Sequence, residues 1–473
     1  MKKEIGLAFL TSCYKESKSV HQLNDVIDWL KDQNNKVKVN ISCIRFDELQ
    51  SWYYDDQKGN IRHDSGKFFS IDGIDVTTNL GLVKNWQQPI INQPEIGYLG
   101  IIVKPVDGVL HFLMQAKIEP GNVNYVQLSP TIQATKSNYT RVHEGKKPAF
   151  LEYFQQAKSH QILLDQLQSE QGARFLRKRN RNIIIQVNEE LTIPDNFIWL
   201  TLYQIKQLMT LDNLVNMDTR TVISGIPYGE YSDFVHLVNS HSTLINQTDL
   251  NDFARSYFDT NHQMNDFDDV ISFITKRKSH YELEVSPVSL KKLNHWVFSD
   301  YTIHHQENKY FRVIAVRVEI DNREVTSWTQ PMIEPAQEGL CAFVCKKING
   351  VLHFAVQAKL ECGNFDIIEL APTVQCLTGN FRAKTSLGLP FLEYVLNASK
   401  DQIVFDNLQS EEGGRFFKEQ NRNLLVIAGD ELSNELPEDF IWMTLNQLHT
   451  FIKFNNYINI QARSLLSAIS FFN

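Results

Sequence analysis

The sequence predicts an α+β protein made of two tandem copies of one domain. Its 473 residues exceed the length that a single hydrophobic core usually supports. Strand-like segments joined by tight turns are mixed with segments that have the apolar spacing of helices. In addition, several short sequence motifs of the first half recur in the second half. These three observations together favour two related domains over one large domain.

The repeat keeps a nearly constant spacing over more than a hundred positions. The matched residues lie 241 to 243 positions apart, which is far longer than the period of a solenoid repeat. We therefore expect an N-terminal domain at 1–222 with an added N-terminal helix, a helical linker at 223–290 and a C-terminal domain at 291–473. The matched pairs are Trp86 and Trp328, Gly108 and Gly350 (both GVLHF), Gln115 and Gln357 (both QAK), Phe150 and Phe391 (both FLEY), and Phe197 and Phe440 (both FIW).

The patterns within the first copy predict its elements in order. Leu23, Val26, Ile27 and Leu30 have helical spacing, and the helix is expected to pack on the first domain. Aromatic stretches around two turns predict a hairpin at 52–69, and the Asp107-Gly108 turn predicts a second hairpin between strands at 98–103 and 109–117. The remaining patterns predict a helix at 150–167, a strand at 183–187 and a helix at 202–211.

Composition narrows the class of protein. With 42% hydrophobic and 22% charged residues and no apolar run long enough to span a bilayer, the chain is typical of soluble globular proteins. The apolar patch near the start is too short for a signal peptide, so we expect a cytoplasmic protein. A net charge of −8 argues against nucleic acid as a partner. The six cysteines form no CxxC pair and no zinc-like set, which favours reduced thiols and predicts no metal site.

The motif on which the two halves agree most closely is QSEQGARF at 168–175 and QSEEGGRF at 409–416. Carboxylates, glycines and an arginine between apolar segments are typical of a site loop. A capped turn is the alternative, because Ser and Glu side chains also satisfy helix N-terminal amides. The candidate site residues here are Gln168, Ser169, Glu170, Gln171, Gly172 and Arg174 in the first copy, and Gln409, Ser410, Glu411, Glu412, Gly413, Gly414 and Arg415 in the second.

Two further features are duplicated. Trp86 and Trp328 precede prolines and offer flat faces for stacking a nucleotide base, although a core role is the alternative. Polar loops after a Pro-Thr-x-Gln run offer hydroxyl, amide and cationic donors to a pyrophosphate, although such loops also occur without function. Since each half has all these features, we expect two nucleotide-binding pockets per chain. The loop candidates are Thr135, Lys136, Ser137, Asn138, Tyr139 and Arg141 in the first half, and Thr373 and Asn380 in the second.

Several common catalytic motifs are missing. The sequence has no GxGxxG after a strand, no P-loop, no HExxH and no nucleophile elbow. It also lacks RExxEExG, the magnesium-binding signature of Nudix hydrolases. His111 and His353 lie in the middle of expected strands and are interpreted as structural.

The chain resembles the sugar-nucleotide (NDP-hexose) 2,3-dehydratase family from about residue 44 to its C-terminus. The resemblance implies a duplicated Nudix-like α+β fold without hydrolase chemistry, a homodimer and a thymidine-diphosphate (dTDP) 4-keto-6-deoxyglucose substrate. It is carried by HDSGKFFSIDGI at 63–74, QPIINQPEIG at 88–97, QAKIEPGN at 115–122, TKSNYTRVH at 135–143, QSEQGARFLRKRNRN at 168–182, DNLVNMDTRTV at 212–222, ELAPTVQC at 369–376 and QSEEGGRF at 409–416.

The implied reaction removes a C3 proton next to the 4-keto group and expels the C2 hydroxyl, and it requires neither a cofactor nor a metal. Glu411, Glu412 or Glu170 is expected to act as base or acid, and Arg174 or Arg415 to hold the enolate or the diphosphate. Only the second copy has adjacent carboxylates, which favours an acid and base pair there. Two alternatives stay open: a non-catalytic sugar-nucleotide-binding protein and a magnesium-dependent pyrophosphohydrolase.

Overall fold

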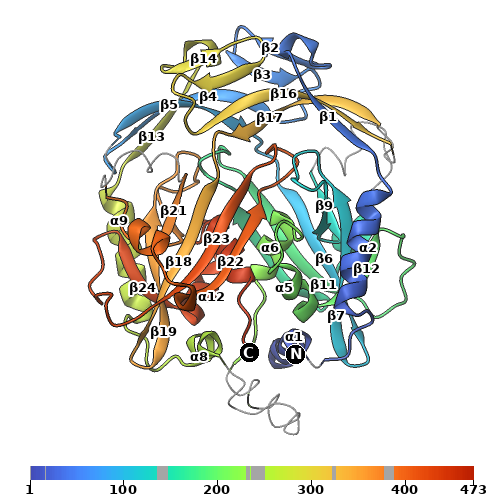
Figure 1. The fold of residues 1–473 in the computed structure, drawn as a ribbon, viewed down its shortest axis with the longest axis vertical. Helices are drawn as coiled ribbons and strands as arrows, with labels where there is room; N and C mark the ends of the chain where they lie inside the picture. Colours follow the sequence, from blue (N-terminus) through green and yellow to red (C-terminus); the bar gives the residue numbers. More distant parts are fainter. Residues whose placement is uncertain are drawn as a thin grey trace.

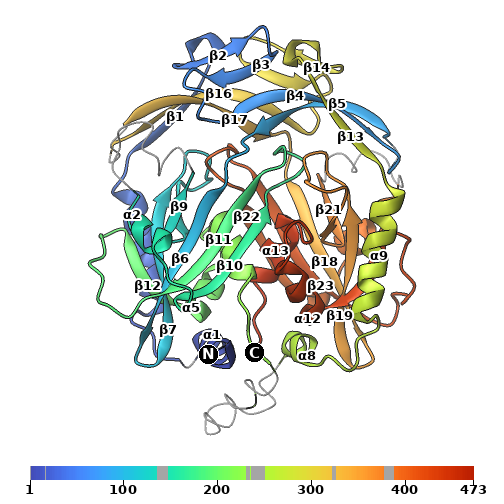
Figure 2. The same ribbon diagram turned by 180° about the vertical axis from the view of Figure 1, so that it is seen from behind.

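The computed structural model describes residues 2–15, 17–81, 83–135, 148–230, 235, 251–321, 326–377 and 388–472. Two large sheets stand side by side, and two smaller sheets lie across their upper ends (Figure 1). The view from behind shows the same arrangement with the halves interchanged (Figure 2). The molecule therefore has an approximate two-fold symmetry, as the sequence repeat predicts.

The elements of the two halves follow one another in the same order. In the first half they are α1 (Lys2–Cys13), α2 (Leu23–Asn35), β1 (Val39–Ile44), η1 (Phe46–Glu48), β2 (Trp52–Asp55), β3 (Asn60–His63), β4 (Ser70–Thr78), β5 (Asn85–Asn92), β6 (Gly97–Val106), β7 (Val109–Ile118), β8 (Val126–Ser129), β9 (Ile132–Ala134), α4 (Leu151–Gln155), β10 (Ile162–Ser169), β11 (Arg179–Gln186), β12 (Phe197–Thr201), α5 (Leu202–Leu208) and α6 (Met217–Ser224). In the second they are α8 (Asp252–Phe258), α9 (Phe267–His280), β13 (Leu283–Val288), η3 (Leu290–Lys292), β14 (Trp296–Phe298), β15 (Thr302–His305), β16 (Phe311–Ile320), β17 (Ser327–Pro335), β18 (Gly339–Ile348), β19 (Val351–Lys359), β20 (Glu369–Ala371), β21 (Val374–Leu377), α11 (Leu392–Leu396), η4 (Lys400–Gln402), β22 (Ile403–Ser410), β23 (Gln420–Ala428), β24 (Phe440–Thr444), α12 (Leu445–Ile452) and α13 (Ile460–Ser467).

Each large sheet has seven strands with equivalent connections. In the first half the order is β10-β11-β6-β7-β12, with β8 on β7 and β9 on β6. In the second half β22-β23-β18-β19 repeats this order, with β24 and β20 on β19 and β21 on β18. The pairs β6 with β11 and β18 with β23 are parallel, and their neighbours are antiparallel. The chain is thus α+β, with two copies of one topology.

The small sheets exchange a strand between the halves. Strand β1, from the start of the chain, pairs with β16 of the second half, from Val39 opposite Ile320 to Ile44 opposite Ala315. In return β13 pairs with β4 of the first half. Strand β16 is largely buried, whereas β1 lies at the edge of its sheet with only Ile44 buried. Each small sheet therefore needs residues from both halves.

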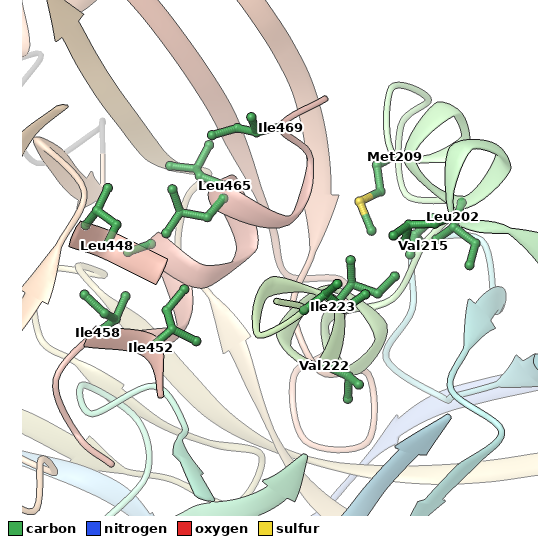
Figure 3. Packing of buried hydrophobic residues seen from close by; sticks show 14 of the residues in the cluster. Leu202, Met209, Val215, Val222, Ile223, Leu448, Ile452, Ile458, Leu465 and Ile469 are labelled. Atoms are coloured by element: carbon green, nitrogen blue, oxygen red, sulfur yellow. The ribbon is translucent and has the colours of Figure 1, made fainter. Parts of the chain in front are cut away.

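The main hydrophobic core is shared as well. Helices α6 and α13 pack against each other at the centre, and their apolar residues belong to one buried cluster with residues of α5 and α12. Burying these side chains on both sides of the symmetry axis joins the halves through the hydrophobic effect. Figure 3 labels Leu202, Met209, Val215, Val222 and Ile223 of the first half and Leu448, Ile452, Ile458, Leu465 and Ile469 of the second in this cluster.

The range 223–290, expected as a helical linker, contains α8, α9 and β13. These elements have counterparts at the start of the chain. In α1, Ser12 donates to a carbonyl of β7 (2.6 Å) and accepts from the amide of Leu202 (2.9 Å). In α8, Ser256 donates to a carbonyl of β19 and accepts from the amide of Leu445 (2.9 Å). We propose that the second repeat begins with α8.

Most of the expected elements are confirmed, with one correction. The hairpins of β2 with β3 and of β6 with β7 form as predicted, and Asp107 and Gly108 have the positive φ angles (50° and 82°) of a tight turn. The predicted helix at 150–167 is wrong. Only Leu151–Gln155 is helical, and from Ile162 the chain pairs with β11 as a strand, because its apolar residues fit the ladder equally well.

None of the helices that the structure describes combines the length and the apolar character needed to cross a membrane. All six cysteines are free, and His111 and His353 are buried in the sheets, as predicted.

The serines of α1 and α8 give a test of the repeat. We expect Ser12→Ala and Ser256→Ala each to lower the free energy of unfolding by about 1–3 kcal/mol, because each leaves a buried amide without an acceptor. Urea denaturation measures this difference. The control is Ser279→Ala, since Ser279 is exposed and bonds only within its own helix (3.0 Å to the Lys276 carbonyl). A loss no larger than that of the control would contradict the proposed equivalence.

Candidate active site

A cavity of about 630 Å³ lies between the first half's large sheet and the small sheets. Its floor comes from β6, β7, β9 and α6, and its upper walls come from the small sheets of both halves. One side is closed by the second half's motif loop, which contributes Glu412, Gly414 and Arg415. The cavity is therefore a composite of both halves, although most of its floor belongs to the first.

Four carboxylates line this cavity among the described residues: Glu119, Glu170, Asp218 and Glu412. Three of them are almost fully buried, with exposed fractions of 3–6%, and Glu412 is partly buried. Gln133 donates to Glu119 Oε1 (2.7 Å) and Asn180 donates to Glu170 Oε1 (2.7 Å). The second oxygen of each of these two glutamates has no hydrogen-bond partner among the described residues. Both of these oxygens are buried.

Burial and mutual repulsion alter the ionisation of this cluster. Burial raises the pKa of Glu412 to about 8, opposed by Arg415 and reinforced by the carboxylates of Glu119 and Glu170. Burial likewise raises the pKa of Asp218 well above its usual range, and Glu170 adds to the effect. The pKa of Glu170 is raised by burial but held down by Arg463 and Lys178. Glu412 therefore carries its proton at neutral pH, which suits acid catalysis.

Within the part of the chain that the structure describes, three cations share the cavity with these acids: Lys117, Lys178 and Arg415. The Lys178 ammonium donates to the backbone carbonyl of Glu95, and burial lowers its pKa. Arg415 donates to Gln93 (3.1 Å) and lies over the ring of Phe69, 4.2 Å from its centroid. Its guanidinium is thus held at the edge of the cavity in a fixed orientation. A cation in this position can meet a phosphate or a developing oxyanion.

The two motif loops are exchanged between the halves. Gln168 of the first loop donates to the carbonyl of Ile452 (2.7 Å), and Gln409 of the second donates to that of Met209 (2.8 Å). Gly172 and Gly413 lie where the loops cross, and a Cβ at either would come within 2.2 Å of an asparagine side chain of the other half. Glycine fits at both positions because side chains of the opposite half pack directly against its Cα atom.

This exchange separates Glu411 from Glu412, which the sequence analysis paired in one site. Glu411 stays in the second half, where Gln171 and Asn421 donate to its two oxygens. Glu412 instead enters the first-half cavity and meets Glu170 there. By the repeat, Glu170 and Glu412 are equivalent to Glu411 and Gln171. The first half thus has two acids where the second half has an acid bonded to an amide.

Other substitutions distinguish the second half's equivalent region. Asp218 is replaced by Gln461 and Lys178 by Glu419, so that region loses one acid from its floor and gains one at its side. Arg174 lies over the ring of Phe311 (4.2 Å), as Arg415 lies over Phe69. The two regions thus share the arginine–aromatic contact, but several of their charged residues differ.

The remaining predicted residues divide between the cavity and the core. Trp328 and Thr135 line the cavity, whereas Trp86 packs against Ile74, Val76 and Ile90. Thr373 is buried and accepts from the amide of Val344 (2.8 Å). Ser169 and Ser410 are buried in contacts between the halves. Lys136, Ser137, Asn138, Tyr139, Arg141 and Asn380 lie outside the described residues.

Sequence reasoning missed several cavity residues. Lys117 and Glu119 lie in QAKIE, which recurs as QAKLE in the second half, so the repeat contained a signal for them. Asp218 and Lys178 differ from their counterparts, and a comparison of the copies for lost charges would have found them. Nothing in the sequence indicated that all four face one cavity.

Comparison with known proteins identifies the family of this chain. The model of the NDP-hexose 2,3-dehydratase family matches residues 23–226 and again 267–469. The chain belongs to the NDP-hexose 2,3-dehydratase family. It is similar to proteins named dTDP-4-dehydro-6-deoxy-α-D-glucopyranose 2,3-dehydratase: 43% identical over 442 residues in Saccharopolyspora spinosa (93% of this chain, 90% of that protein), 40% over 446 in Streptomyces violaceoruber (93% and 95%) and 38% over 452 in Amycolatopsis orientalis (94% and 90%).

The cavity has the groups that a 2,3-dehydratase of this family needs. The reaction requires a base for the C3 proton, an acid for the departing hydroxyl and a donor for the enolate oxygen. We propose that carboxylates with different surroundings supply the first two and that the cations supply the third. Among the described residues no group of three or more His, Cys, Asp or Glu side chains is arranged to hold a metal ion.

Two adjacent glutamates allow a sharp test of which half contains the chemistry. We expect Glu412→Gln to lower kcat by about 10²-fold to 10⁴-fold, because the amide keeps the shape but has no proton to donate. Glu411→Gln changes the neighbouring residue in the same way but outside the cavity, and should leave kcat within a few-fold. Steady-state assays on purified, folded variants measure both. The opposite result would move the chemistry to the second half.

The buried acids also predict how stability depends on pH. Burial raises the pKa of Glu412 to about 8 and those of Glu369 and Glu419 to about 7, from 4.5. The folded state then binds more protons than the unfolded state between these values. Stability is greatest below about pH 4.5 for these groups and falls as pH rises towards 8, by at most about 1.4 kcal/mol per pH unit for each group. Chemical denaturation across this range should show a shallower fall in Glu412→Gln.

Proposed function

We propose that this protein is a dTDP-4-keto-6-deoxy-D-glucose 2,3-dehydratase. It removes the C3 proton and the C2 hydroxyl of the sugar as water and leaves an enol, which tautomerises to a 3,4-diketo-2,6-dideoxy sugar nucleotide for deoxysugar biosynthesis. The observation that carries this proposal is the first-half cavity, where four carboxylates and three cations meet, in a member of this family.

The 4-keto group makes the first step accessible. It acidifies the C3 proton, so a carboxylate can remove it and leave an enolate between C3 and C4. Glu170 is our candidate for the base, because it lines the cavity and because Lys178 and Arg463 oppose the rise in its pKa that burial causes. Lys117 or Arg415 then holds the enolate oxygen.

The second step expels the C2 hydroxyl, which is a poor leaving group unless it is protonated. Glu412 is our candidate for the acid, because a carboxyl with a pKa of about 8 carries its proton at neutral pH. Electrons of the enolate form the C2–C3 double bond as the C–O bond breaks, and the proton leaves with the hydroxyl as water. The neighbouring carboxylates of Glu119 and Glu170 disfavour a further negative charge and so help to keep the proton on Glu412.

The nucleotide end is placed by the remaining cavity walls. Trp328 presents a half-buried aromatic ring to the cavity and Thr135 a hydroxyl, which suits a base and a phosphate respectively. We also propose that each repeat has a Nudix-like fold, that the protein is a cytoplasmic homodimer and that only the first-half pocket is catalytic. Light scattering of the purified protein tests the dimer.

The decisive experiment supplies dTDP-4-keto-6-deoxyglucose and follows the product by mass spectrometry in H₂O and D₂O, with a diamine to trap adjacent ketones. We expect loss of one water and uptake of one solvent deuteron at C2, with or without a metal chelator. Substrate labelled with deuterium at C3 should lose its label and react more slowly if proton removal limits the rate.

The two alternatives have distinct signatures in this experiment. Release of thymidine monophosphate that requires magnesium would identify a pyrophosphohydrolase. Binding without any change in sugar mass, over several 4-keto sugar nucleotides, would identify a non-catalytic binding protein.

A further inference from the structure

Two buried arginines cross between the halves at the centre of the molecule. Arg463 on α13 and Arg220 on α6 have exposed fractions of 0% and 2%, and the two helices pack against each other. Arg463 donates to the backbone carbonyl of Ser169 in the first motif loop, and Arg220 to that of Ser410 in the second. Each loop is therefore held by an arginine of the opposite half.

Arg463 is itself rigidly placed. Its Nε donates to Thr221 (3.0 Å), and another guanidinium nitrogen donates to the carbonyl of Ile458 (2.5 Å). The hydroxyl of Ser169 donates in turn to Glu369 Oε2 (2.8 Å). Ser169 directly precedes Glu170, so two side chains of the second half fix the residue next to the candidate base.

We propose that Arg463 and Glu369 are positioning residues for the dehydration, which fix the orientation and the charge of Glu170 in the first-half cavity. This inference rests on the proposed function. It gives the second half a role in the first half's chemistry beyond the contribution of Glu412 and Arg415.

The difference between the copies supports an electrostatic role for Glu369. Its counterpart is Gln127, and Ser410 donates to the Gln127 amide oxygen at 2.7 Å, as Ser169 does to Glu369. An amide is therefore a sufficient tether. The carboxylate occurs only beside the loop that leads to the cavity, and its Oε1 has no hydrogen-bond partner among the described residues.

Glu369 and Glu170 share one guanidinium. Arg463 lowers the pKa of both carboxyls, against burial, which raises them. When Glu369 is ionised, it offsets part of the positive charge that favours ionised Glu170. The other charged groups that face Glu170 are Lys178, Glu411, Glu412 and Asp218, and those that face Glu369 are Lys278 and Glu361.

The test compares Arg463→Gln, Arg463→Lys and Glu369→Gln. Arg463→Gln removes the positive charge that favours ionised Glu170. The acid limb of the pH profile of kcat should therefore move to higher pH. Glu369→Gln removes the competing carboxylate, so the limb should move to lower pH. We expect displacements of about 0.5 pH unit or more. Arg463→Lys keeps the positive charge but loses the several N–H donors of the planar guanidinium group. It should therefore lower kcat about 10-fold to 10²-fold, while KM and the acid limb of the pH profile stay nearly unchanged.

Displacement of the acid limb in opposite directions in Arg463→Gln and Glu369→Gln would distinguish a positioning role from a purely structural one. Loss of a structural role would lower the melting temperature without moving the limb in two directions. Glu369→Gln should fold normally, since glutamine already occupies the equivalent position of the other copy. Displacement in the same direction, or none, in Glu369→Gln and Arg463→Gln would overturn the proposal. If Arg463→Gln does not fold, Glu369→Gln and Arg463→Lys decide it.

An infrared titration tests the positioning role without any catalytic turnover. The band of the protonated Glu170 carboxyl is assigned by its loss in Glu170→Gln, and its midpoint should shift in the same two directions without any substrate. Wild-type protein that fails to turn over dTDP-4-keto-6-deoxyglucose would defeat the proposed function. Midpoints that stay fixed in both variants would defeat the positioning role.

Discussion

The exchange of the two motif loops is the contact on which the rest of the structure depends. Arg463 and Arg220 bond to carbonyls of the opposite half, and Gln168 and Gln409 do the same from the loops. These groups are buried, so separating the halves would exchange their hydrogen bonds for bonds to water, at a net cost of about 0.5–1.5 kcal/mol each. The exchanged strands β1 and β13 add to this cost. The two repeats therefore cannot be treated as independent domains joined by a linker.

The exchange also explains how two similar copies acquire different chemistry. A substitution in one loop alters the site of the opposite half, so Glu412 adds an acid to the first half while Gln171 closes off Glu411 in the second. Asp218 adds a further acid to the first half, whereas Lys178 gives it a cation where the second half has Glu419. The first half gathers acids that repel one another and hold protons, whereas the second half satisfies its central carboxylate with two amides.

The sequence was sufficient for the features that depend on local chemistry or on the repeat. The Asp107-Gly108 turn, the duplication and the motif loops were predictable because turn residues and a constant spacing are visible in one dimension. The directions of the Glu411 and Glu412 side chains were not predictable. Only the exchange of the two motif loops decides which half each side chain faces. The apolar run at 150–167 was misread for a similar reason. Its residues fit a helix or a ladder, and pairing with β11 decides between them.

The charge of the substrate limits how it can lie in the cavity. A diphosphate brings negative charge to a site that already contains four carboxylates, and like charges in a poorly solvated cavity repel strongly. We propose that the diphosphate lies against cations of the cavity, with the uncharged sugar towards Glu170 and Glu412. A bound anion makes the removal of a proton from Glu412 costlier. On this proposal, the crowding of acids that destabilises the empty site also keeps the Glu412 proton in place until the C2 hydroxyl accepts it.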